Sequence, residues 1–170
     1  MMRPIYLTQR RVTLVDDADY DWLSQWRWFA HRDHRTFYAR RGIWRNGTTT
    51  IVKMHRLILD APPGSETDHI NGNGLDNRRC NLRLCSTAEN QYNSRKRLGT
   101  SSCYKGVSRH RKQWRAMIKV QGRSIHLGCF GDEEAAACAY DEAARQSFGR
   151  FACINFPNDH EEASHAVSTR

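Results

Sequence analysis

The 170-residue sequence contains no long apolar run and only four prolines. No stretch approaches the roughly eighteen apolar residues that a membrane-spanning helix requires, and the first residues lack the apolar segment of a secretory signal. These absences exclude a membrane-spanning helix and predict a cytoplasmic protein with no membrane partner. The composition, 39% hydrophobic and 26% charged, is that of a folded domain or of two or three small ones.

The six cysteines are scattered and form no C-x-x-C pair. Reduced thiols are therefore expected, in place of a disulfide framework or a four-ligand zinc site. Cys80 and Cys85 leave half of a zinc site as a minor alternative.

The net charge of +9 is unevenly distributed along the chain. Residues 99–130 carry seven basic and no acidic side chains, whereas residues 131–170 carry three basic and eight acidic ones. A patch dominated by arginine suits phosphate groups and base edges, so nucleic acid is the leading partner. The alternative is a solvated basic face without a ligand.

Residues 1–53 are interpreted as a β-rich segment, because short β-branched runs alternate there with turn signals. Four of the five tryptophans lie in this segment and are expected to supply most of a small core. Asn46-Gly47 between two strand-like runs predicts a hairpin.

Residues 54–98 form a second segment, predicted to run strand, loop, strand, helix. The strands are expected at Glu66–Ile70 and Cys80–Leu84, on either side of the turn-rich loop 71–77. Ser86-Thr87-Ala88-Glu89 has the form of a capping box, so a helix is expected from Thr87 to about Lys96.

Residues 99–102 are read as a linker, followed by a separate domain over 103–157 and a polar tail over 158–170. Apolar and cationic residues alternate along Gln113–Val120, the pattern of a strand with one buried face. Two neighbouring strands, Tyr104–Arg109 and Arg123–Leu127, and a helix capped by Asp132 complete an expected three-stranded antiparallel sheet packed on one helix. The fold class predicted for the whole chain is α+β.

Asp68, His69, Asn81 and Asn90 form the constellation that carries chemistry. Carboxylate and amide oxygens suit a hard cation such as Mg²⁺. A neutral histidine can take a proton from an attacking water if an asparagine fixes its orientation. Metal and base together make phosphodiester hydrolysis feasible. The alternative is that these residues only organise a polar loop.

These residues, within Asp68-His69-Ile70-Asn71-Gly72-Asn73, Asp76-Asn77-Arg78, Asn81-Leu82-Arg83 and Glu89-Asn90, resemble an HNH endonuclease of the homing type, with a ββα-metal finger over 54–98. The resemblance implies Asp68 and Asn90 as metal ligands, His69 as general base and Asn81 as the residue that orients it. It implies a divalent metal, Mg²⁺ with Mn²⁺ as a substitute. His55 also matches that family, without a definite role.

Residues 103–157, with Tyr104-Lys105-Gly106-Val107, Trp114-Arg115-Ala116 and Ile125-His126-Leu127-Gly128, resemble an Apetala-two/ethylene-response-factor DNA-binding domain. That resemblance implies a sheet laid in the major groove of double-stranded DNA. The candidate contact residues are Lys105, Arg109, Arg111, Arg115, Lys119, Arg123 and His126.

The sequence thus predicts a metal-dependent, site-directed DNA endonuclease in a bacterial or phage-infected host cell. The oligomeric state stays open: a monomer, which would nick one strand, is favoured over a dimer, which could cut both. One alternative is a DNA-binding regulator without catalysis, which an intact Asp68, His69, Asn81 and Asn90 argues against. The other is a zinc-binding interaction module, for which the sequence lacks ligand pairs.

Overall fold

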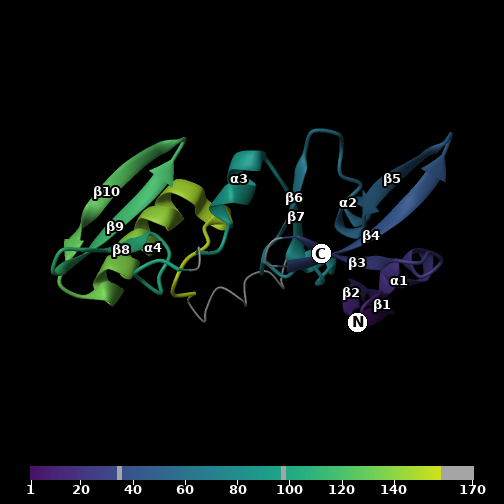
Figure 1. Cartoon of the computed structure of the whole chain (residues 1–170), viewed down its shortest axis with the longest axis horizontal. Helices are drawn as coiled ribbons and strands as arrows, with labels where there is room; N and C mark the ends of the chain where they lie inside the picture. Colours follow the sequence, from purple (N-terminus) through teal and green to yellow (C-terminus); the bar gives the residue numbers. More distant parts are fainter. Residues whose placement is uncertain (34–35, 97–98, 158–170) are drawn as a thin grey trace, which may run out of the picture. The chain divides into compact units, whose positions relative to one another are not determined.

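A computed structural model shows that the chain divides into two compact units, Met1–Asn90 and Gln91–Arg170 (Figure 1). Each unit combines short helices with small antiparallel sheets, which confirms the expected mixed α and β class. The structure describes residues 1–33, 36–96 and 99–157. Two predicted parts lie outside the described residues: the polar tail 158–170 and the last two residues, 97–98, of the second segment.

The first unit contains three sheets of two or three strands. Within it, the segment 1–53 packs together with the segment that follows, and the two share one hydrophobic core around Leu23, Trp28 and Met54. Its elements are β1 (Met2–Tyr6), β2 (Val12–Asp16), α1 (Asp17–Leu23), β3 (Phe29–Asp33), β4 (Thr36–Arg45), β5 (Thr48–Lys53), α2 (Met54–Ile58), β6 (Glu66–His69), the 3₁₀ turn η1 (Arg79–Asn81), β7 (Leu82–Cys85) and α3 (Thr87–Tyr92).

Local sequence signals account for the turns and caps of this unit. The predicted Asn46-Gly47 turn joins β4 to β5, and both of its residues have positive φ. The capping box is formed reciprocally: the Ser86 backbone N–H donates to Glu89 Oε2 at 2.7 Å, and the Glu89 N–H donates to Ser86 Oγ at 3.2 Å. Of the four tryptophans expected to form the core, Trp44 is 70% exposed near the hairpin tip.

Helix α3 is shorter than predicted. It ends at Tyr92, four residues before the expected Lys96, where the Ser94 N–H donates to the Gln91 carbonyl in a turn. A polar Asn93-Ser94 pair, which competes for backbone hydrogen bonds, explains why the helix does not continue.

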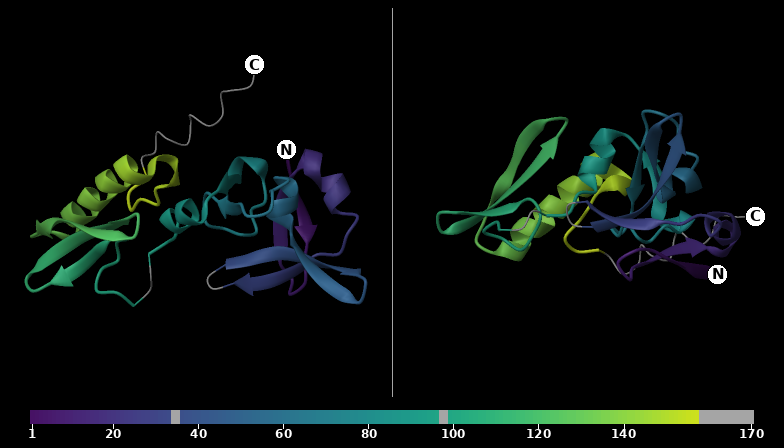
Figure 2. Two further views of the ribbon diagram at one scale, coloured as in Figure 1. Left: turned by 90° about the horizontal axis from the view of Figure 1, so that it is seen from above. Right: turned by 45° about the vertical axis from the view of Figure 1, so that its right-hand side comes forward.

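The second unit is a three-stranded antiparallel sheet in the order β10-β9-β8, with α4 lying across one face (Figure 2). Its elements are β8 (Val107–His110), β9 (Gln113–Val120), β10 (Arg123–Phe130), α4 (Glu133–Phe148) and the 3₁₀ turn η2 (Gly149–Phe151). Helix α4 begins as predicted, with the Ala135 N–H donating to the Asp132 carboxylate at 2.8 Å.

Strand β8 begins at Val107 and not at the expected Tyr104, because Gly106 breaks the extended backbone. Gly106 has a φ of 79° and lies against Tyr140 of α4, where an added Cβ would come within 1.9 Å of the tyrosine ring. Ala116, Ile118, Ala136 and Tyr140 are buried between sheet and helix.

The described part of the chain contains neither a helix that could cross a membrane nor a disulfide bond. No helix there is long and apolar enough to cross a membrane. All six cysteines lie in the described ranges and are free thiols.

Candidate active site

The predicted catalytic pair lies at the end of β6, in the first unit. Asp68 and His69 are 6% and 5% exposed, and antiparallel pairing places them opposite Arg83 and Leu82 of β7. Arg83 donates from Nε and from Nη2 to Oδ2 of Asp68, at 2.9 and 2.6 Å. The cationic partner balances the charge of a carboxylate that is otherwise costly to bury.

The His69 ring is held by Asn77, which lies within the HNH-like motif of the sequence but had no role predicted for it. Nε2 of His69 lies 3.0 Å from Oδ1 of Asn77, and the Asn77 side chain is fully buried. Burial lowers the pKa of His69, against the opposing effects of the Asn77 hydrogen bond and the nearby Asp68 carboxylate. The histidine is thereby kept in the neutral form that a general base requires.

Two further rings surround His69. Its ring centroid lies 4.9 Å from that of His55 in α2 and 5.7 Å from that of Tyr38 in β4. His55 is 3% exposed, and its Nδ1 has no hydrogen-bond partner among the described residues. Burial, and then the neighbouring His69, lower the pKa of His55 to about 2. Both histidines are therefore neutral at physiological pH.

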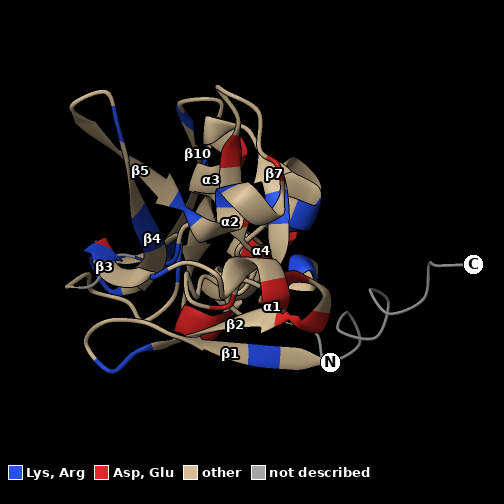
Figure 3. Ribbon diagram, turned by 90° about the vertical axis from the view of Figure 1, so that its right-hand side faces the viewer, with Lys and Arg blue, Asp and Glu red and all other residues tan. Residues whose placement is uncertain are grey.

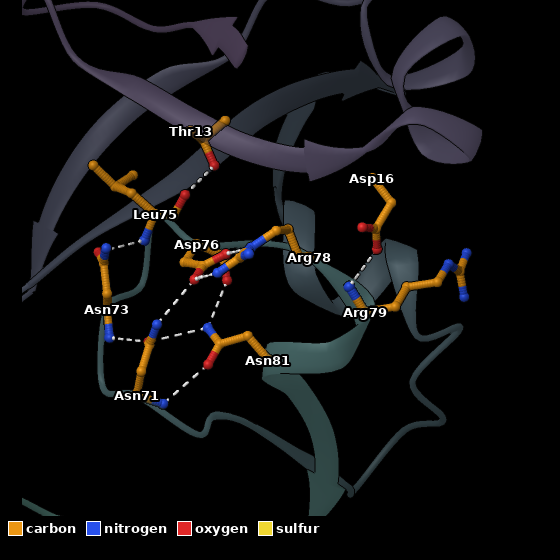
Figure 4. Close-up of polar contacts among 9 residues, drawn as sticks. All are labelled: Thr13, Asp16, Asn71, Asn73, Leu75, Asp76, Arg78, Arg79 and Asn81. Carbon is orange, nitrogen blue, oxygen red and sulfur yellow. Dashed lines mark hydrogen bonds and ion pairs between the residues drawn. The ribbon is translucent and has the colours of Figure 1, made fainter. Parts of the chain in front are cut away.

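Asn81, predicted to orient His69, contacts the loop that follows His69 (Figure 4). Its Oδ1 accepts from the Asn71 N–H at 2.9 Å, and its Nδ2 donates to the Asn71 side-chain oxygen at 3.0 Å and to the Asp76 carbonyl at 2.8 Å. Its own carbonyl accepts from the Ile70 N–H at 2.9 Å. Asn81 thus ties the two ends of the loop together directly after His69.

The same loop is fastened to the N-terminal part of the chain. Asp19 of α1 is 2% exposed and accepts two 2.7 Å hydrogen bonds from the guanidinium of Arg79, and the Arg79 N–H donates to Asp16. Asp76 holds Arg78 in a second two-bond pair, which lowers the pKa of the Asp76 carboxyl. Red segments on α1 and blue ones on β4 show the uneven charge of this unit (Figure 3). Because the contacts of Arg79 span about sixty residues of sequence, no local pattern could have revealed them.

Asn90, the second predicted metal ligand, lies on α3, where its N–H donates to the Ser86 carbonyl. Within residues 1–33, 36–96 and 99–157, no three His, Cys, Asp or Glu side chains form a metal-holding group. The pair Asp68 and Asn90 is not such a group, because it has two members and one of them is an asparagine. The two side chains offer a carboxylate oxygen and an amide oxygen, which are the donor types that a hard divalent cation with several bound waters prefers.

In the second unit, the sheet register divides the predicted DNA-contact residues between two faces. Arg115 pairs with Ser108 and Cys129, and Lys119 with Ser124, so these residues share the face opposite α4. His126, paired with Met117, lies on the same face. Nε of Arg115 has no hydrogen-bond partner among the described residues.

The other four predicted contact residues lie elsewhere. Arg109 and Arg123 pair with Trp114 and Val120, on the α4 side of the strands, and the Arg109 guanidinium lies 4.8 Å from the Trp114 ring centre. Arg111 lies in the turn between β8 and β9. The fourth is Lys105, whose Nζ donates to the Tyr92 carbonyl at 2.7 Å.

Comparison with known proteins matches the segment that contains Asp68 and His69 to one family. The HNH endonuclease family profile matches residues 52–92, which contain β6, the loop, β7 and α3. Protein 3.8 of Escherichia phage T7 is 32% identical over 93 residues, which cover 54% of this chain and 76% of the phage protein. An uncharacterised HNH endonuclease of Acanthamoeba polyphaga mimivirus is 32% identical over 111 residues, covering 61% of this chain and 57% of that protein.

A second group of relatives consists of plant proteins. An AP2-like ethylene-responsive transcription factor of Arabidopsis thaliana is 40% identical over 72 residues, 35% of this chain. The matched region spans only 24% of that plant protein and 57% of the mimivirus one. Together the matches show that the chain belongs to the HNH endonuclease family and joins an HNH motif to an Apetala-two/ethylene-response-factor-like domain.

Proposed function

We propose that the protein is a metal-dependent, site-directed DNA endonuclease of the homing type, which hydrolyses phosphodiester bonds. The observation that carries this proposal is His69: a buried, neutral imidazole next to Asp68, inside the segment that the HNH profile matches. Hydrolysis at neutral pH needs a neutral base that can accept a proton from water and a carboxylate that can hold a metal ion, and His69 and Asp68 offer these two groups.

In the proposed reaction, His69 takes a proton from water as the water oxygen bonds to phosphorus. The bond from phosphorus to the leaving ester oxygen breaks, and that oxygen receives a proton from solvent. Asp68 and Asn90 would hold Mg²⁺, or Mn²⁺ in its place, which would offset negative charge on the phosphate and on the leaving oxygen. Asn81 would act through the loop, by keeping Asn71 and Asp76 closed behind His69.

The second unit would supply affinity and site selection on double-stranded DNA. We assign the outer sheet face, defined by Arg115, Lys119 and His126, to the major groove. Arg111 and Arg123 lie at or next to the strand turns and suit flanking phosphates, as does Arg109 at the sheet edge. Lys105, which holds the Tyr92 carbonyl, would serve the fold in place of DNA contact. With one metal site per chain, a monomer would nick one strand.

The test is conversion of supercoiled plasmid by the wild type and by His69→Ala, with Mg²⁺, with Mn²⁺ and with chelator. Metal-dependent relaxation that is lost in His69→Ala supports the proposal, and linear product would indicate cutting of both strands. His31→Ala is the matched control, because His31 is an exposed histidine on β3 outside the site. Equal activity of His69→Ala and wild type would remove His69 from the reaction.

One contact favours a second candidate, a DNA-binding regulator without catalysis. Arg83 already engages Oδ2 of Asp68 through two hydrogen bonds, so a metal ion would have to share this carboxylate. Tight, salt-sensitive DNA binding without plasmid conversion under any metal condition would favour that candidate.

A further inference from the structure

The N-terminal strand β2 contributes one side chain to the surroundings of His69. Thr13 is fully buried, and its hydroxyl donates to the Leu75 carbonyl at 2.7 Å (Figure 4). The same oxygen accepts from Nδ2 of Asn77, at 2.7 Å. Oδ1 of Asn77 in turn lies 3.0 Å from Nε2 of His69. A continuous buried chain of hydrogen bonds therefore runs from a backbone carbonyl, through Thr13 and Asn77, to the imidazole.

Each bond in this chain fixes the direction of the next. A carbonyl can only accept, so the single hydroxyl proton of Thr13 is committed to Leu75. The Thr13 oxygen must then accept from Asn77, which sets the NH₂ end of the amide toward Thr13 and the oxygen toward His69. An amide oxygen can only accept, so Nε2 of His69 must carry the proton. A neutral imidazole protonated on Nε2 has its lone pair on Nδ1.

We propose that Thr13 and Asn77 are positioning residues that hold His69 in the Nε2-protonated form and leave Nδ1 to take the proton from the attacking water. The proposal deepens the proposed function and rests on His69 acting as its base. It also gives the N-terminal segment a role: β2 selects the tautomer of a histidine that lies more than fifty residues later in the chain.

The backbone around this chain leaves little room for rearrangement. The Leu14 N–H donates to the Leu75 carbonyl at 2.9 Å, and the Asn77 N–H donates to the Leu14 carbonyl at 2.8 Å. Leu14 and Asp76 form a parallel bridge between β2 and the loop. With Thr13 and Asn77 both at 0% exposure, solvent does not compete for the hydroxyl or for the amide.

Asn77 and Asn81 thus have different tasks. The amide of Asn81 bonds to Asn71 and to the Asp76 carbonyl, and so shapes the loop. The amide of Asn77 bonds to the imidazole itself. Substituting Asn81 should therefore disturb the loop that follows His69. Losing the Thr13 hydroxyl should instead change which nitrogen of the His69 ring carries the proton.

The experiment is a nitrogen NMR measurement on full-length protein labelled with ¹⁵N-histidine, without DNA or metal, so that it does not depend on cleavage. The His69 signals are assigned by their absence in His69→Gln. Nitrogen shifts and couplings to the ring protons distinguish a protonated Nε2 from a protonated Nδ1. The expected result for the wild type is protonation on Nε2. A wild type protonated on Nδ1 would overturn the proposal, whether or not the protein cuts DNA.

Thr13→Val keeps the shape of the side chain and removes the hydroxyl, whereas Thr13→Ser keeps the hydroxyl. In Thr13→Val the Asn77 amide loses its fixed direction, so we expect a mixture of His69 tautomers and a fall of about tenfold in the cleavage rate of bound DNA, with DNA affinity unchanged. Thr13→Ser should restore the single tautomer and most of the rate. Thr50→Val, at an exposed position on β5, controls for the substitution itself.

The outcomes separate this proposal from the proposed function. A wild-type tautomer and rate in folded Thr13→Val would overturn the role of Thr13. If Thr13→Val does not fold, the wild-type spectrum and the Thr13→Ser variant still test the role of Thr13. A mixture of His69 tautomers in folded Thr13→Ser, which keeps the hydroxyl, would also overturn that role. If His69 is protonated on Nε2 but no plasmid is cleaved, the result supports the hydrogen-bond chain and contradicts the proposed endonuclease activity.

Discussion

The imidazole rings of His55 and His69 meet edge to face, with centroids 4.9 Å apart and ring planes at 83°. Both rings are buried, and both histidines have lowered pKa values. Two protonated rings at this separation would repel each other in a site that water does not screen. The free energy of unfolding therefore depends on pH, because both histidines bind protons more readily in the unfolded chain than in the folded one.

The first prediction concerns stability in mild acid. The pKa of His55 is about 2 in the folded state and about 6.5 when unfolded, so the unfolded chain binds more protons between these values. The contribution of His55 is thus fully present above about pH 6.5 and is lost as the pH falls. The free energy of unfolding should decrease by up to about 1.4 kcal/mol per pH unit for each such group. Urea unfolding between pH 7 and pH 5 measures this slope.

His55→Phe should reduce that slope, because phenylalanine fills the ring position without a titrating group. His31→Phe, at an exposed position, is the control and should leave the slope unchanged. An identical pH slope in His55→Phe and wild type would show that His55 is not protonated on unfolding in this range.

The second prediction tests the attachment of the loop to α1. Arg79→Met leaves the buried Asp19 carboxylate with the Trp22 indole N–H as its remaining described partner, at 3.2 Å. Since the Arg79 side chain is half exposed, solvent softens the loss, and we expect about 2 kcal/mol less unfolding free energy in urea titrations. Arg27→Met, at an exposed arginine, should change it by less than about 0.5 kcal/mol. If Arg79→Met and Arg27→Met had equal unfolding free energies, the ion pair of Arg79 and Asp19 would not contribute to stability.

Local signals in the sequence predicted local structure well. The Asn46-Gly47 turn, the Ser86 capping box and strand β9 depend on residues a few positions apart, and the structure shows each of them. The sequence could also point to His69, through its resemblance to a known motif. It could not point to Thr13 or Asp19, whose partners lie 64 and 60 residues away. Such contacts depend on how β2 and α1 pack against the loop, which no periodic pattern encodes.

The third prediction compares two glycines with similar backbone angles. Gly106 and Gly122 have φ of 79° and 81°, so alanine is strained at both. Only at Gly106 would the new Cβ meet a ring, 1.9 Å from Tyr140, whereas nothing lies within 4 Å at Gly122. We expect Gly122→Ala to cost about 1 kcal/mol and Gly106→Ala about 3 kcal/mol or more, measured by thermal unfolding. A similar loss at both positions would mean that the sheet and α4 can separate locally without cost.

The fourth prediction concerns the outer sheet face. Arg115 lies in the central strand, on the sheet face opposite α4 that we assign to DNA. Arg115→Ala should weaken DNA binding by about 1–3 kcal/mol while the cleavage rate of bound DNA stays near that of the wild type. If Arg115 contacts a phosphate, the slope of log K against log salt should become shallower by about 0.9, and if it contacts a base, discrimination between sites should fall instead. Arg150→Ala, in η2 and away from the sheet strands, is the matched control. Salt titrations that give both variants the wild-type affinity and slope would remove Arg115 from the DNA interface.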